Sequence, residues 1–122
     1  MQQLRVLIIE DDGMISLLLT ILLEEMGYEV CATAATEDEA VAAADQTRPD
    51  LIIADVNLRE GSGIGAMNRI GLVHRIPHIF ATADVSAIRE SRPDAMMIQK
   101  PYHFVELQNA INTALGLALS AS

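Results

Sequence analysis

Short runs of aliphatic and β-branched residues alternate with longer stretches of helical periodicity along the whole chain. Five runs are almost entirely apolar, which is the pattern of strands covered by helices on both faces. The predicted strands span residues 4–9, 28–33, 50–54, 78–81 and 94–99. Apolar residues at helical spacing follow each strand, and the predicted helices span about 15–26, 36–46, 64–74, 85–91 and 104–118.

The boundaries of these helices carry their own signals. Gly27 follows the first helix, where a C-cap glycine belongs. Thr36 and Glu39 form a capping-box pattern, and Pro49 stops the second helix. The first helix carries a stripe of apolar residues that we interpret as core: Ile15, Leu18, Leu19, Leu22, Leu23 and Met26.

Strands that alternate with helices predict βαβ units and a parallel sheet. Right-handed crossovers then favour an α/β fold, a flavodoxin-like (βα)5 doubly wound parallel sheet with strand order 2-1-3-4-5. The length of 122 residues and the absence of linkers or repeats predict a single domain, 1–122. Ligands of such sheets bind beyond the carboxyl ends of the strands, here between the first and third strands.

The composition of the chain limits the classes of partner that it is expected to bind. The chain has 17 acidic and 8 basic residues, a net charge of −9, and Lys100 is its only lysine. This charge disfavours nucleic acid and anionic membrane surfaces. The apolar stretch 14–23 is too short to span a membrane, and the start of the chain is unlike a signal peptide. With a lone cysteine, Cys31, the chain is expected in the cytoplasm.

Acidic residues follow the two strands that flank the predicted binding crevice. Glu10, Asp11 and Asp12 come after the first strand, and Asp55 after the third. Carboxylates packed together repel one another unless a cation lies among them. Hard oxygen donors in an incompletely enclosed site favour Mg²⁺. Glu10 and Asp11 are the better placed to hold the metal.

Two further groups project from the same edge of the sheet. Thr82 follows the fourth strand and Lys100 the fifth. A cation site, an ammonium and a hydroxyl are the groups that phosphoryl transfer requires. Asp55, alone at the end of the central strand, is the candidate nucleophile for an aspartyl phosphate.

Each residue taken alone has a simpler explanation. Asp11, Asp12 or Thr82 could cap a helix, Asp55 could cap a loop, and Lys100 could lie in a surface turn. The interpretation as a site depends on all of them lying at one edge, in strand order.

The segments VLIIEDD, LIIADVNL, IFATAD and IQKPY occur in this order along the chain. On these segments the sequence resembles a response-regulator receiver domain over its whole length. The resemblance implies that Asp55 accepts a phosphoryl group from the phosphohistidine of a sensor histidine kinase or a histidine phosphotransfer protein. It also implies that Thr82 and Lys100 contact that group.

The resemblance implies a metal site as well. Asp11 and Asp55 would ligate Mg²⁺ together with the backbone carbonyl of Asn57, and Glu10 would act directly or through water. The family usually has a cis peptide bond before the proline that follows the lysine, here Pro101.

Three features depart from the family pattern. Met97 stands where most receivers have an aromatic residue that swings inward on phosphorylation. Residues 59–63 lack the family's proline and are glycine-rich, which predicts a more mobile loop. The segment 80–82, Phe-Ala-Thr, is similar to the FATGUY subgroup of single-domain receivers, although residues 83–85 differ from that subgroup.

The sequence therefore predicts a stand-alone, phosphorylation-controlled binding module rather than an enzyme. Its signal would leave by protein contact, through the face of the fourth helix, fifth strand and fifth helix. A phosphate sink is a variant of the same chemistry. The alternatives are an aspartyl-phosphate hydrolase, a flavin carrier and a receiver that has lost phosphorylation. Asn57 replaces the hydrolase's general acid, the acids repel a flavin phosphate, and the intact acids, Thr82 and Lys100 oppose the third.

Two other patterns are discounted. Residues 61–65 resemble a phosphate-binding loop but follow the third strand and lack the glycine spacing of that motif. His74, His78 and His103 have no ligand-like spacing with Cys31, so a zinc site is not predicted.

Overall fold

The computed structural model of the chain describes residues 3–116. Its five parallel strands form one sheet in the order β2-β1-β3-β4-β5, as predicted. The strands are β1 (Arg5–Ile9), β2 (Glu29–Ala34), β3 (Leu51–Asp55), β4 (His78–Thr82) and β5 (Met97–Gln99). The helices are α1 (Gly13–Glu25), α2 (Glu37–Thr47), α3 (Gly63–Ile70), α4 (Val85–Ser91) and α5 (Phe104–Ala114).

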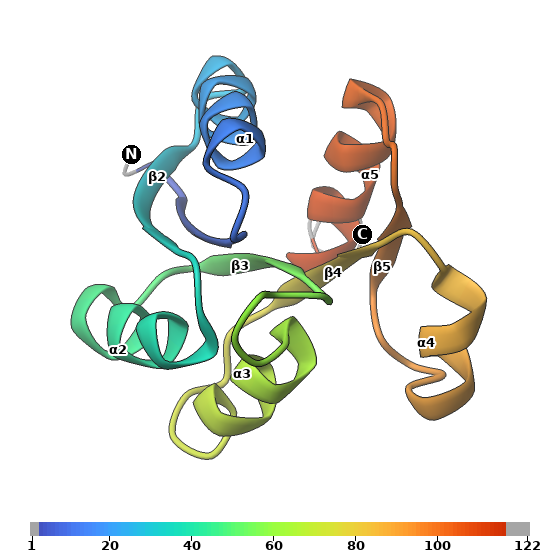
Figure 1. Ribbon diagram of the computed structural model, residues 1–122. Coiled ribbons are helices and arrows are strands. Elements are labelled where there is room, and N and C mark those ends of the chain that lie inside the picture. The colour runs from blue at the N-terminus through green and yellow to red at the C-terminus, as the bar shows by residue number, and fades with distance from the viewer. Residues whose placement is uncertain (1–2, 117–122) are drawn as a thin grey trace.

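The helices form a layer on each face of the sheet. Figure 1 shows α1 and α5 on one face and α2 and α3 on the other. Each layer encloses its own apolar cluster: one joins alternate strand residues to α1 and α5, and the other joins the intervening residues to α2 and α3. The central strands are buried on both sides, which accounts for their almost continuous apolar sequence.

The predicted core stripe of α1 is wrong in part. The residues that face the sheet are Ser16, Leu19 and Leu23, whereas Ile15 and Leu18 are 39% and 58% exposed. Residues 14–23 are apolar around nearly the whole helix, so periodicity did not identify the face that packs.

Two predicted boundaries were also too generous. The third helix ends at Ile70 rather than His74, because the N–H groups of Leu72 and Val73 donate to carbonyls only three residues back, at 3.2 Å and 3.0 Å, in turns rather than in an α-helix. The fifth strand begins at Met97, not at 94, because Ala95 closes a turn onto the carbonyl of Arg92.

The fifth helix is seen as far as Ala114, and the predicted helical residue Ala118 lies outside the described residues. Within residues 3–116, no helix combines the length and the apolar character needed to cross a bilayer.

Candidate functional site

The segment after β1 brings carboxylates to the carboxyl edge of the sheet. Glu10 is buried, and its side chain accepts a hydrogen bond from the N–H of Asp12 at 3.1 Å. Asp12 is the N-cap of α1, because its carboxylate accepts from the N–H groups of Met14 and Ile15. The capping explanation therefore holds for Asp12, which leaves Glu10 and Asp11 free of that role.

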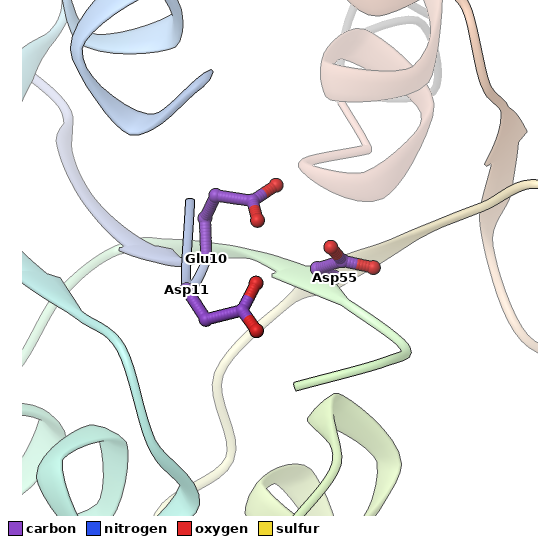
Figure 2. Close-up of side chains that lie close together, drawn as sticks. All are labelled: Glu10, Asp11 and Asp55. Atoms are coloured by element: carbon purple, nitrogen blue, oxygen red, sulfur yellow. The ribbon is translucent and has the colours of Figure 1, made fainter. Parts of the chain in front are cut away.

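Asp55 completes an acidic cluster at the end of β3. Oxygen atoms of Glu10, Asp11 and Asp55 all lie within 4.8 Å of one another. Figure 2 shows the three side chains close together, with Glu10 and Asp11 just after β1 and Asp55 at the end of β3. The order of the strands explains this arrangement, because β1 and β3 are hydrogen-bonded neighbours. Three anionic groups at this separation repel one another unless positive charge lies nearby.

Lys100 supplies one such charge from the end of β5. Its ammonium nitrogen lies 2.8 Å from Asp55 Oδ2 and 3.5 Å from Glu10 Oε1. The backbone N–H of Lys100 donates to the carbonyl of Thr82 at 2.7 Å, which fixes the lysine beside β4. The peptide bond between Lys100 and Pro101 is cis. The only lysine of the sequence thus contacts two of the three predicted acids.

Burial and charge shift the proton affinities of these groups. Burial raises the pKa of Glu10, as does the neighbouring charge of Asp55, against the lowering effect of the Asp12 N–H and of Lys100. Burial lowers the pKa of Lys100, but its hydrogen bond to Asp55 and the two carboxylate charges outweigh burial and leave that pKa above its ordinary value. Burial also raises the pKa of Tyr102, which lies close enough to interact with the charges of Glu10, Asp55 and Lys100.

Thr82 and Asn57 lie at the same edge. Ala81 pairs with Asp55 in the sheet, so Thr82 stands one residue further toward the site. Its side chain is buried, and its hydroxyl accepts a hydrogen bond from the N–H of Asp84 at 3.1 Å. The N–H of Asn57 donates to Asp55 Oδ1 at 3.2 Å. The helix capped from this segment begins after Asp84, so Thr82 is not its N-cap.

One residue of the site region was missed from the sequence. Glu37, in the first turn of α2, accepts from the N–H of Ser62 at 3.3 Å and pairs with Arg69 at 3.0 Å. A Cβ at Gly61 would lie 2.6 Å from the Glu37 side chain, so the two segments are in close contact. Glu37 therefore ties down the glycine-rich loop that follows β3. The acidic first turn of α2 was visible in the sequence, but nothing there indicated its contact with this loop.

The donor set fits Mg²⁺. All three groups of the cluster are carboxylates, the hard oxygen ligands that this ion prefers. In the described part of the chain, no other group of three histidine, cysteine or acidic side chains is close enough to hold a metal. Asp11 keeps one oxygen occupied, since Oδ2 accepts from the N–H of Arg59 at 2.8 Å.

Relief of charge repulsion gives the first testable prediction. Asp11→Asn should raise the melting temperature of the metal-free protein by roughly 3–6 °C, because removal of one of three like charges is worth on the order of 1 kcal/mol. The same variant should gain much less from added Mg²⁺ than the wild-type chain does, because it has lost one of the three carboxylates of the cluster. Melting curves with and without Mg²⁺, at equal ionic strength, measure both effects. A variant that is less stable without metal and equally responsive to it would contradict the prediction.

Comparison with known proteins points to one family. The response regulator receiver domain family matches residues 6–112. The chain is 38% identical over 120 residues to the phyllosphere-induced regulator PhyR of Methylorubrum extorquens, covering 95% of this chain and 45% of PhyR. The chain spans about half the length of the curated relatives it matches.

Solved structures agree with the sequence relatives. The receiver domain of PhyR from Erythrobacter litoralis superposes with a TM-score of 0.86 and 33% identity, covering 93% of this chain and 91% of that domain. The receiver domain of the sensor histidine kinase PA1611 from Pseudomonas aeruginosa gives a TM-score of 0.82 and 27% identity, with coverage of 94% and 99%. That structure holds a magnesium ion in its active-site cleft.

Proposed function

Because this chain belongs to the response regulator receiver domain family of two-component signalling, we propose that it accepts a phosphoryl group on Asp55. The donor would be the phosphohistidine of a sensor histidine kinase or of a histidine phosphotransfer protein. The observation that carries this proposal is the 2.8 Å contact between the Lys100 ammonium and Asp55, beside the carboxylates of Glu10 and Asp11.

The transfer exchanges one bond for another. The P–N bond of the donor histidine breaks, and a P–O bond to a carboxylate oxygen of Asp55 forms. Lys100, already beside that carboxylate, would neutralise charge on the transferring oxygens. The hydroxyl of Thr82 would donate to one of them while it still accepts from Asp84. Histidine is restored on the donor, and the chain itself is the acceptor, so the role is that of a signalling module.

Glu10, Asp11, Asp55 and the backbone carbonyl of Asn57 are the groups proposed to hold Mg²⁺. When bound, the ion would supply positive charge against the phosphoryl oxygens and the carboxylates. The close approach of three carboxylates supports this assignment, since Lys100 alone does not balance their charge.

A small phosphodonor tests the proposal without a partner protein. We expect the chain to gain the mass of one phosphoryl group when it is incubated with acetyl phosphate and Mg²⁺. Peptide mapping should place the group on the segment that contains Asp55. Chelation of Mg²⁺ with EDTA should remove the gain. A chain that stays unmodified, or that is modified equally in EDTA, would contradict the proposal.

An exposed apolar surface beside the site supports a protein as the donor. Met14, Leu17, Leu18 and Ile21 are all about half exposed or more on α1. Phe104 and Val105, at the start of α5, are exposed as well, and α1 and α5 cover the same face of the sheet (Figure 1). We propose that this α1–α5 surface contacts the donor while its histidine reaches Asp55.

A charge on this surface should separate docking from chemistry. Leu18→Glu is expected to slow transfer from a phosphorylated histidine kinase at least about tenfold, because a carboxylate would be placed in an apolar contact. Labelling by acetyl phosphate should be unchanged. The matched control is Leu72→Glu, at a residue that is 85% exposed after α3. A panel of purified kinases first identifies the one that labels the wild-type chain fastest, and equal transfer to both variants would refute the docking surface.

Residues 1–122 would act as one receiver unit in the cytoplasm, because kinase phosphohistidines are made there from ATP. Phosphorylation would change a protein contact of the α4-β5-α5 face. A phosphate sink that drains a kinase uses the same site.

A further inference from the structure

The segment between β4 and α4 is held by a side chain from the edge strand. Gln99 pairs with Thr82 in the sheet. Its side-chain amide donates to the carbonyl of Ala83 and accepts from the N–H of Val85 at 3.3 Å. Both polar atoms of this amide therefore form hydrogen bonds with residues between the end of β4 and the start of α4.

Asp84, which lies between Ala83 and Val85, makes hydrogen bonds of its own. The N–H of Asp84 donates to the hydroxyl of Thr82, and the carboxylate of Asp84 accepts from the N–H of Ala87 at 3.2 Å in the first turn of α4. Thr82 therefore holds Asp84, and Gln99 holds Ala83 and Val85. Displacement of the Thr82 hydroxyl must change its hydrogen bond with Asp84. Ala83 and Val85 can move with Asp84 only if Gln99 also moves or its hydrogen bonds to them break.

We infer that Gln99 is a positioning residue that couples Thr82 and Lys100 to the first turn of α4. The inference rests on the proposed phosphorylation of Asp55, which gives both residues a new partner. Gln99 directly precedes Lys100, whose N–H donates to the Thr82 carbonyl. The amide side chain therefore belongs to the same strand end as the ammonium that contacts Asp55, and a shift of either phosphoryl contact reaches Val85 through it.

Gln99→Leu removes both hydrogen bonds at an exposed position and keeps the size of the side chain. We expect the N–H of Val85 to exchange with deuterium about five- to thirty-fold faster in this variant, which is the effect of losing one or two hydrogen bonds. In the wild-type chain, Mg²⁺ with the phosphoryl analogue beryllium trifluoride should change the exchange of Val85 and Ala87. In Gln99→Leu that change should fall below about half of its wild-type size.

Two further variants separate coupling from simple support. Gln46→Leu makes the same change on an exposed position of α2 and should leave both measurements as in the wild-type chain. Gln99→Glu keeps an acceptor for the Val85 N–H and should restore most of its protection. Amide exchange resolved by NMR gives each residue separately.

The outcomes are distinct. Wild-type exchange of Val85 in Gln99→Leu would show that Gln99 does not hold this segment. A full response of α4 to the analogue in that variant would overturn the coupling. A wild-type chain in which the analogue changes no amide around Asp55 would instead remove the proposed function. The exchange measured without the analogue distinguishes these cases, because it does not require phosphorylation of Asp55.

Discussion

Asp55→Asn is expected to abolish the phosphate-sized mass gain that acetyl phosphate and Mg²⁺ produce. An amide oxygen is a far weaker nucleophile than a carboxylate, and the variant also loses a negative charge that attracts Mg²⁺. The fold should survive, because the amide has the size of the carboxylate and its oxygen can still accept one of the two hydrogen bonds that Lys100 and Asn57 donate to Asp55.

The same strand offers a matched control. Asp50, the residue directly before β3, accepts from the N–H of Arg5 at 2.8 Å and lies at the end of the strand away from the acidic cluster. Asp50→Asn should therefore be labelled at the wild-type rate. A mass gain that persists in Asp55→Asn would mean that another group accepts the phosphoryl, and the proposed acceptor would be wrong.

Gly63→Ala is expected to damage both the stability and the site. A Cβ at this position would lie 2.2 Å from the backbone oxygen of Asp55 and 2.9 Å from its carbonyl carbon. No side chain can rotate away to relieve the contact, so the backbone of β3 or of α3 must move. We expect a loss of about 3 kcal/mol in the free energy of unfolding, equivalent to roughly 9–18 °C in melting temperature. Labelling should fall by about tenfold or more, because the displaced group carries the acceptor.

Gly13 provides the matched control for the substitution at Gly63. A Cβ at Gly13, the first residue of α1, would meet nothing within 4 Å. Gly13→Ala should therefore be neutral or stabilising by about 0.5 kcal/mol, since alanine restricts the unfolded chain. Thermal melting and acetyl phosphate labelling of both variants are the measurements. If Gly63→Ala melted within about 2 °C of the wild-type chain, the close approach to Asp55 would not be rigid.

The positions of the main site residues could be predicted because they depend on topology. Apolar runs identify the strands, and a parallel sheet places the residues after each strand at one edge. This reasoning placed Glu10, Asp55 and Lys100 together without any knowledge of side-chain contacts. It also placed Thr82 at that edge, where the structure has it one residue beyond the partner of Asp55.

Contacts between long side chains and distant backbone could not be predicted in the same way. Glu37 reaches the loop after β3, and Gln99 reaches the loop after β4, through hydrogen bonds that no periodicity encodes. The exposed face of α1 was missed for a different reason. Its sequence is apolar on nearly every side, so only the packing of Ser16, Leu19 and Leu23 determines which residues remain outside.

The distance along the chain between the charged groups has a consequence for synthesis. Lys100 is separated from Glu10 by 90 positions, yet the two side chains meet at 3.5 Å. While the ribosome is still making β5, the strands that carry Glu10, Asp11 and Asp55 are already available to pair, without the lysine that lies against them in the finished domain. A nascent chain that stops before Lys100 would thus assemble the acids without their ammonium. Lys100 is therefore the last of these four charged groups to emerge, shortly before α5.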